Sequence, residues 1–170
     1  MIKVGEKAPS FTLDAYHAGE IKKVSLSDYK GKWIILFFYP RDFTFVCPTE
    51  LRGFQDHIKE FEQANAVVLG ASTDSEHSHK AWFSKELSEV KYPVLSDPAH
   101  TLTRAYGILI EEEGKALRGT FIIDPDGVLQ YMVVSNLNVG RSVTETIRVL
   151  KACQTGELCP IEWKPGDKTL

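Results

Sequence analysis

The sequence predicts an α/β protein in which one mixed β-sheet carries helices on both faces. Two continuous apolar runs, residues 33–39 and 66–72, have the length and composition of strands buried on both sides. The first run is followed by apolar residues spaced three and four apart, as in an amphipathic helix, and the second by another helical segment. A hairpin and a last helix come next, and this order of elements is typical of a mixed α/β sheet.

Each further element has a local signal. Weak alternation around an Ala-Gly turn predicts an N-terminal hairpin, and a Pro-Asp-Gly turn predicts a second hairpin later in the chain. Pro40 ends the first buried strand because proline has no N–H for a sheet ladder. Ser142 and Glu145 form a capping box that begins the last helix. In order, we expect a hairpin of residues 11–13 and 21–26, a helical turn at 27–31, a strand at 33–39, a helix from Cys47 through Phe61, a strand at 66–72, a helix from Ser75 through Val90, a strand at 92–95, a helix at 102–106, a hairpin of 118–123 and 128–134, and a helix from Ser142.

Length and composition indicate one globular domain. The 170 residues are 43% hydrophobic and 25% charged, which suits a single domain with a substantial core. We place this domain at residues 1–155 and expect a loop-like tail at 156–170. A net charge of −3 gives no indication of a nucleic-acid or anionic-membrane partner. No apolar run is long enough to span a membrane, and the N-terminus lacks a signal-peptide core, so a cytoplasmic protein is expected.

The three cysteines, Cys47, Cys153 and Cys159, do not form a disulfide framework. There is no Cys-x-x-Cys pair and no set of cysteines and histidines with zinc-site spacing, so neither a metal nor a cofactor is expected. In a reducing compartment, cysteines of this kind are more often catalytic or inert than structural. His77 and His79 lie two positions apart and are interpreted as surface residues.

Cys47 is the strongest candidate for chemistry. It lies where the buried strand gives way to a helix, directly before Pro48, and proline is favoured at the start of helices. Free backbone N–H groups at a helix start favour negative charge, and the thiolate is the nucleophilic form of cysteine. Thr44, three residues earlier, can bring a hydroxyl to the same place. The alternative is a buried cysteine that serves only as a small apolar residue.

The pattern Pro40-x-x-x-Thr44-x-x-Cys47-Pro48 resembles the active-site signature of the peroxiredoxins. The wider run F-F-Y-P-R-D-F-T-F-V-C-P-T-E is similar to the branch that contains the alkyl hydroperoxide reductase peroxidase subunit and the typical two-cysteine enzymes. The resemblance covers nearly the whole chain. It implies a thioredoxin-like fold, with a central mixed sheet, an N-terminal hairpin and an extended C-terminal tail. It also implies a thiol-dependent peroxidase acting on hydrogen peroxide and alkyl hydroperoxides.

The resemblance assigns roles to individual residues. Cys47 would be the peroxidatic nucleophile, which attacks the O–O bond and becomes a sulfenic acid. Thr44 would hydrogen-bond the thiolate and the peroxide, although such a hydroxyl can also satisfy turn backbone. Arg118, in R-G-T-F-I-I-D, resembles the family's active-site arginine; taken alone, it would read as a solvent-exposed strand-end residue. Pro40 would shield the sulfur from water as well as ending the strand.

For two further candidate site residues, a role in the site and a purely structural role are equally well supported by the sequence. Glu50, one turn into the Cys47 helix, could orient an arginine or simply complement the helix dipole. Arg141, in Val139-Gly140-Arg141-Ser142, resembles a second family arginine near the site, and it could also be a surface residue before a helix.

The segment Gly156 to Trp163 resembles the one that carries the resolving cysteine of typical two-cysteine peroxiredoxins. By this resemblance, Cys159 of one subunit would attack the Cys47 sulfenic acid of its partner and form an intersubunit disulfide. A homodimer, assembling into a ring of dimers, is implied with it. Cys153 is not required by the family pattern; it is either a packed helix residue or a third redox thiol that relays the disulfide.

Three questions stay open at the level of sequence. One alternative function is a cysteine hydrolase, which would need a base near Cys47. Another is a redox-dependent oligomer that acts as a holdase or peroxide sensor, and this role is compatible with peroxidase activity. The reductant would be a dithiol protein, either thioredoxin or a dedicated flavoprotein. Residues 109–117 lack the Gly-Gly-Leu-Gly loop of easily overoxidised family members, and the chain has no C-terminal Tyr-Phe helix, so resistance to overoxidation is expected.

Overall fold

A computed structural model describes all residues from Met1 to Leu170. The elements, in chain order, are β1 (Thr12–His17), β2 (Glu20–Ser25), the 3₁₀ helix η1 (Leu26–Tyr29), β3 (Trp33–Phe38), α1 (Cys47–Asp56), α2 (Ile58–Gln63), β4 (Ala66–Ser72), α3 (Glu76–Glu86), β5 (Val94–Ser96), α4 (Thr101–Ala105), β6 (Leu109–Ile110), β7 (Lys115–Ala116), β8 (Arg118–Ile123), β9 (Leu129–Ser135) and α5 (Val143–Thr155). None of the helices is both long enough and apolar enough to cross a membrane.

Seven strands form one mixed sheet in the order β2-β1-β5-β4-β3-β8-β9. The two continuous apolar runs of the sequence are β3 and β4, which pair in parallel at its centre, and β5 continues the parallel part. The hairpins β1–β2 and β8–β9 add antiparallel pairs on either side. The expected mixed sheet is therefore confirmed, and β8 lies directly beside the strand that leads to Cys47.

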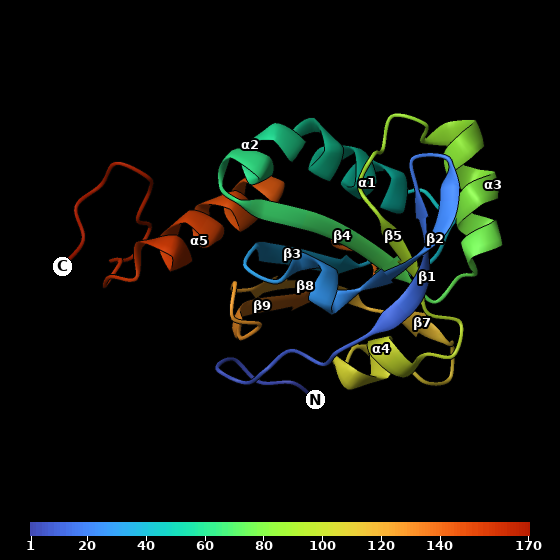
Figure 1. The fold of residues 1–170 in the computed structure, drawn as a ribbon, viewed down its shortest axis with the longest axis horizontal. Helices are drawn as coiled ribbons and strands as arrows, with labels where there is room; N and C mark the ends of the chain where they lie inside the picture. Colours follow the sequence, from blue (N-terminus) through green and yellow to red (C-terminus); the bar gives the residue numbers. More distant parts are fainter.

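The alternation of side chains along β3 divides the core into two clusters, one on each face of the sheet. Helices cover the two faces unequally (Figure 1). Ile35, Phe37 and Tyr39 point to one face, which α1, α2, α3 and α5 cover. Ile34, Leu36 and Phe38 point to the other face, which is covered by α4, the N-terminal segment and loop residues. Helices on both faces were expected, but the burial is unequal because four of the five α-helices share one face.

The structure corrects two sequence-based predictions. The helix expected from Cys47 through Phe61 is broken at His57, whose backbone (φ −103°, ψ 10°) leaves the helical range and whose Nδ1 lies 2.9 Å from the Gly53 carbonyl oxygen. Despite this break, Phe61 of α2 packs in the same core cluster as Leu51 and Phe54 of α1, as the spacing of the apolar residues predicted. His79 is not a surface residue: its side chain is 0% exposed, since α3 turns it toward the sheet.

A third prediction is wrong in extent: the helix expected from Ser75 through Val90 ends at Glu86, so Leu87 and Val90 reach the core from the segment that follows. One further feature has no sequence signal. The small β6–β7 hairpin occupies residues 109–116.

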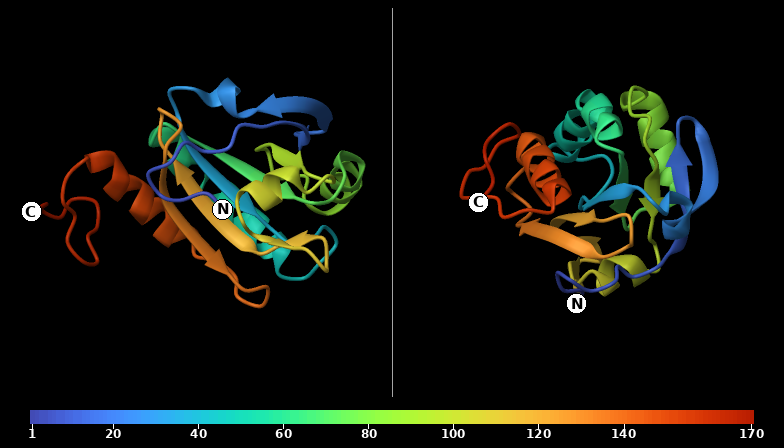
Figure 2. Two further views of the ribbon diagram at one scale, coloured as in Figure 1. Left: turned by 90° about the horizontal axis from the view of Figure 1, so that it is seen from below. Right: turned by 60° about the vertical axis from the view of Figure 1, so that its left-hand side comes forward.

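The tail at 156–170 contains neither helix nor strand and lies beyond the C-terminal end of α5 (Figure 2). It folds back on the helix, because Trp163 is buried and its carbonyl oxygen accepts a hydrogen bond from Arg148 Nη1 at 2.8 Å.

Candidate active site

The junction of β3 and α1 positions Cys47. Strand β3 ends at Phe38, Pro40 is buried at the start of the loop, and α1 begins at Cys47 itself with Pro48 in its first turn. The Cys47 side chain is completely buried. The sulfur therefore lies at a helix start, where free N–H groups favour negative charge, and it is held in a packed core.

Arg118 reaches Cys47 from the neighbouring strand. It is the first residue of β8, which pairs with β3, and its Nη1 lies 3.5 Å from Cys47 Sγ although the two residues are 71 positions apart. Its Nε donates to the Leu137 carbonyl oxygen at 2.8 Å, which fixes the plane of the guanidinium. A permanently charged, oriented donor thus faces the sulfur.

Glu50 joins this arginine to a second one. Arg118 Nη1 donates to Glu50 Oε2 at 2.7 Å, and Arg141 donates to Glu50 Oε1 through Nε at 3.0 Å and through its backbone N–H at 3.1 Å. Arg141 also donates to the Phe38 carbonyl oxygen at 2.6 Å, and its guanidinium carbon lies 5.1 Å from the centre of the Phe37 ring. Glu50 thus orients the arginine that faces the thiol.

The cluster carries a net positive charge in a buried place. The side chains of Glu50, Arg118 and Arg141 are 3%, 4% and 4% exposed, and two guanidiniums against one carboxylate leave one positive charge unbalanced. Burial lowers the pKa of Arg141 from its ordinary value, while the Glu50 carboxylate opposes this effect. An unbalanced buried charge is costly, and a Cys47 thiolate would neutralise it.

Thr44 and Pro40 lie in the loop before the helix. The Thr44 hydroxyl donates to the Arg41 carbonyl oxygen at 3.0 Å, so its hydrogen bond goes to its own loop and not to the Cys47 sulfur. Pro40 is buried. Of the predicted site residues, the structure brings Cys47, Glu50, Arg118 and Arg141 into one cluster and leaves the Thr44 hydroxyl outside it.

The other two cysteines lie at the far end of α5. Cys159 Sγ is 3.4 Å from Thr155 Oγ1 and 3.8 Å from the Ala152 carbonyl oxygen, both in the last turn of the helix. Cys153 packs partly against the core, and burial, helped by Cys159, raises the pKa of its thiol. All three cysteines are free. The raised pKa disfavours the thiolate of Cys153 and fits the packing interpretation of this residue.

The cluster can support nucleophilic chemistry at sulfur. A buried thiolate would face one guanidinium that can also contact an incoming oxygen, and preorganised donors of this kind stabilise charge that develops during a reaction. No group of three or more His, Cys, Asp or Glu side chains lies close enough to hold a metal ion. A cavity of about 650 Å³ beneath η1 and the β8–β9 turn contains none of the cluster residues.

Sequence reasoning missed a polar group next to this loop. Asp42 and His79 are both buried and hydrogen-bonded to each other. The only available signal for Asp42 was an acidic residue within the Pro40 to Cys47 signature, and His79 had none because the start of α3 reads as a polar, exposed turn.

Comparison with known proteins decides the family. Residues 4–132 match the model of the AhpC/TSA family. The chain belongs to this family. It is 53% identical over 175 residues to a putative peroxiredoxin, YkuU, of Bacillus subtilis, with 98% of this chain and 97% of that protein covered. It is 51% identical over 175 residues to a thioredoxin peroxidase of Echinococcus granulosus, covering 98% of this chain and 91% of that protein.

Among solved structures, the reduced 2-Cys peroxiredoxin of Plasmodium vivax superposes with a TM-score of 0.94 at 34% identity, covering 99% of this chain and 93% of that chain. The thioredoxin-like peroxiredoxin fold is therefore confirmed. This member of the AhpC/TSA family is a thiol-dependent peroxidase, which uses a hydroperoxide as substrate and a dithiol as reductant.

Proposed function

We propose that this chain reduces hydroperoxides through Cys47. The observation that carries the proposal is the 3.5 Å contact from Arg118 Nη1 to Cys47 Sγ, within a buried cluster whose two guanidiniums exceed its one carboxylate. A thiolate, which is the form of cysteine that attacks an O–O bond, would balance that charge.

The reaction follows from the cluster. The Cys47 thiolate attacks one peroxide oxygen, an S–O bond forms as the O–O bond breaks, and the sulfur gives up two electrons to become a sulfenic acid. The departing oxygen leaves as alkoxide or hydroxide and takes a proton from solvent to give alcohol or water. Arg118 stabilises the negative charge as it moves from sulfur to oxygen, and Glu50 and Arg141 hold Arg118 in place. In this proposal Pro40 excludes water. The Thr44 hydroxyl donates to the Arg41 carbonyl oxygen and keeps lone pairs that can accept from the peroxide O–H.

Cys159 of a partner subunit resolves the sulfenic acid in this proposal, with release of water and formation of an intersubunit disulfide. The support is geometric. Arg141, just before α5, contacts Glu50 beside Cys47, whereas Cys159 lies at the opposite end of this 13-residue helix, about 20 Å away. Because disulfide sulfurs must approach to about 2 Å, pairing within one chain would require the tail to leave α5.

The sheet offers a surface for such a homodimer. β9 is an edge strand of the seven-stranded sheet, and Val133 and Val134 on it are 40% and 38% exposed. An edge strand with exposed apolar residues is a template for pairing with another chain. We further propose that the dimers assemble into a ring. The chain would divide into a peroxiredoxin domain at residues 1–155 and a redox-active tail at residues 156–170, and the protein would be cytoplasmic.

The reductant belongs to the same proposal: a dithiol protein, thioredoxin or a dedicated flavoprotein, reopens the disulfide. The geometry does not support a hydrolase. His57 follows the end of α1 opposite to Cys47, and its ring contacts the Gly53 carbonyl oxygen there. Without a base beside Cys47, acyl chemistry lacks its proton acceptor.

Oxidation with one equivalent of hydrogen peroxide tests the resolving step. Non-reducing electrophoresis and intact mass should show a covalent dimer for the parent and none for Cys159→Ser, because only Cys159 supplies the second sulfur. Cys153→Ser is the matched control, six residues away at the same helix end. It should give the parental dimer and unchanged turnover with a dithiol reductant.

Other outcomes would contradict this assignment in distinct ways. A disulfide-linked monomer would show that the tail resolves within its own chain. A dimer that also requires Cys153 would establish the relay interpretation of that thiol.

A further inference from the structure

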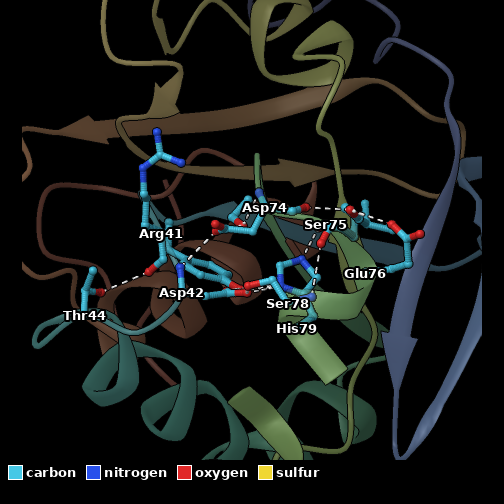
Figure 3. Close-up of polar contacts among 12 residues, drawn as sticks. Arg41, Asp42, Thr44, Asp74, Ser75, Glu76, Ser78 and His79 are labelled. Atoms are coloured by element: carbon cyan, nitrogen blue, oxygen red, sulfur yellow. Dashed lines mark hydrogen bonds and ion pairs between the residues drawn. The ribbon is translucent and has the colours of Figure 1, made fainter. Parts of the chain in front are cut away.

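A second buried polar cluster lies beside the loop that precedes Cys47 (Figure 3). At its centre, His79 Nδ1 lies 2.8 Å from Asp42 Oδ2, and the two side chains are 0% and 1% exposed. Asp42 belongs to the loop between β3 and α1, whereas His79 belongs to α3. This pair therefore links the loop that carries Thr44 to a helix of the main core.

Each ring nitrogen of His79 lies within hydrogen-bond distance of an acceptor. Nδ1 faces the Asp42 carboxylate, and Nε2 lies 3.0 Å from the Leu95 carbonyl oxygen. Both partners are acceptors, and a neutral imidazole has only one N–H to donate. A neutral ring would leave one buried nitrogen lone pair against an oxygen, so the geometry fits the imidazolium.

The surrounding groups agree with this charge. The Asp42 carboxylate accepts hydrogen bonds from Tyr39 Oη at 2.7 Å and Ser78 Oγ at 2.8 Å, and His79 is the cation that contacts it. Burial and then the Asp42 charge raise the pKa of Tyr39 well above its ordinary value, so this hydroxyl stays neutral. Asp74 is the other acid near the ring.

Two further hydrogen bonds anchor the same loop, one through its backbone and one through a side chain. The Asp42 N–H donates to Asp74 Oδ2 at 2.9 Å, and Arg41 Nη2 donates to the Glu113 carbonyl oxygen at 2.8 Å. The next residue, Phe43, has φ +57°, a left-handed conformation that persists only where neighbouring contacts enforce it. Thr44 Oγ1 then bonds the Arg41 carbonyl oxygen, so the placement of Thr44 depends on the anchored residues before it.

We propose that His79 is a positioning residue for the peroxide reaction: paired as an imidazolium with Asp42, it holds the 40–46 loop, and with it Thr44, in place at the start of the Cys47 helix. This inference rests on the proposed peroxidase role of Cys47 and deepens it. His79 contacts neither the sulfur nor Arg118, so it acts on the loop and not on the ionisation of the thiol.

The pair gives the reaction a definite pH dependence. Burial by itself lowers the pKa of His79, but the hydrogen bond and charge of Asp42, the Leu95 carbonyl oxygen and the Asp74 carboxylate outweigh it and raise the pKa above its ordinary value. The pair therefore stabilises the fold fully below the unfolded-state pKa of histidine, and its contribution is lost as pH rises through the higher folded-state pKa. The loop anchor should weaken on the alkaline side.

The test compares His79→Asn and Asp42→Asn with His77→Gln. Asparagine at position 79 can offer a neutral donor near the Nδ1 position but carries no charge. His77 is the matched control because it lies on the same helix with its side chain 79% exposed. Three quantities are measured against pH: the second-order rate constant with hydrogen peroxide, the ultraviolet absorbance of the Cys47 thiolate in a Cys153→Ser, Cys159→Ser background, and the His79 ring nitrogens by NMR of isotope-labelled histidine.

The parent should show both His79 ring nitrogens mainly protonated at pH 6.5, the ordinary pKa of histidine, and its rate constant should fall over the pH range in which His79 loses a proton. His79→Asn and Asp42→Asn should lower the rate constant by about tenfold to a hundredfold, as expected for a misplaced catalytic group, and should remove that alkaline fall. Their thiolate absorbance should stay parental, which a general loss of structure would not allow. His77→Gln should match the parent throughout.

A mainly neutral His79 at pH 6.5 in the parent would overturn the inference, and this arm needs no variant to fold. Parental rates and pH profiles in both asparagine variants would overturn it as well. A loss of thiolate absorbance in step with the rate would assign the pair to general stability instead. If the parent itself fails to react with peroxide, the proposed role of Cys47 fails first, and that result is visible without any His79 variant.

Discussion

Replacing Cys47 by serine should reduce peroxide consumption to the rate of the reductant alone. Serine has nearly the same shape, but its hydroxyl does not ionise beside Arg118 and cannot give two electrons to an O–O bond. The measurement is hydrogen peroxide consumption with a dithiol reductant, run in parallel with ester hydrolysis. Cys153→Ser is the matched control and should retain the parental peroxidase rate. Turnover that survives in Cys47→Ser would move the chemistry to another residue, and ester hydrolysis that depends on Cys47 would revive the hydrolase alternative.

Replacing Arg118 by glutamine should lower the second-order rate constant with hydrogen peroxide by about 10²- to 10³-fold, the usual loss on removal of one preorganised donor. The fold should survive because Glu50 keeps its three contacts with Arg141. The thiolate absorbance of Cys47 at neutral pH should fall together with the rate, since the positive charge nearest the sulfur is gone. Stopped-flow fluorescence of the tryptophans measures the rate.

Two comparison variants sharpen this result. Arg118→Lys keeps the charge but loses the planar fork that contacts Cys47, Glu50 and Leu137 together, so it should recover only part of the rate. Arg104→Gln removes an arginine that is 54% exposed and paired with Glu111 on the surface, and it should change nothing. A parental rate in Arg118→Gln would contradict the role of the 3.5 Å contact.

Much of the fold is encoded by local patterns. Strands β3 and β4 were predicted from continuous apolar runs, and the β8–β9 hairpin from its Pro-Asp-Gly turn. The start of α5 was predicted from a capping box, of which the structure has one half: Ser142 Oγ accepts from the Glu145 N–H, whereas the Glu145 carboxylate binds Arg148. Each signal lies within a few residues of the element that it specifies. Such signals predict which elements exist and suggest their layers, but not which strands become neighbours.

The candidate active site depends on those neighbours. Arg118 meets Cys47 because β8 pairs with β3, and no periodicity in the sequence specifies that pairing. Arg118 was singled out as a partner of Cys47 by family resemblance alone. The sequence allowed two interpretations of Glu50, and the structure places this carboxylate between two arginines. The Thr44 hydroxyl bonds its own loop, as the alternative interpretation of this residue predicted and the role implied by the resemblance did not.

His79 shows the limit of pattern reading. The segment Glu76-His77-Ser78-His79 is polar throughout, so its two histidines look alike in sequence. In the structure one is exposed and the other is buried against Asp42, because the helix turns them to different faces. Their difference depends on the position of a loop 37 residues earlier, which only tertiary packing determines.

The most direct test of the account is the oxidation state of Cys47 after one equivalent of hydrogen peroxide in the Cys153→Ser, Cys159→Ser variant. With no second thiol left to resolve it, the oxidised sulfur should persist as a sulfenic acid, seen by intact mass as one added oxygen and located at Cys47 by trapping and peptide mapping. An unmodified Cys47 in a variant that still consumes peroxide, or an oxygen located elsewhere, would contradict the claim that this thiol is the one that reacts.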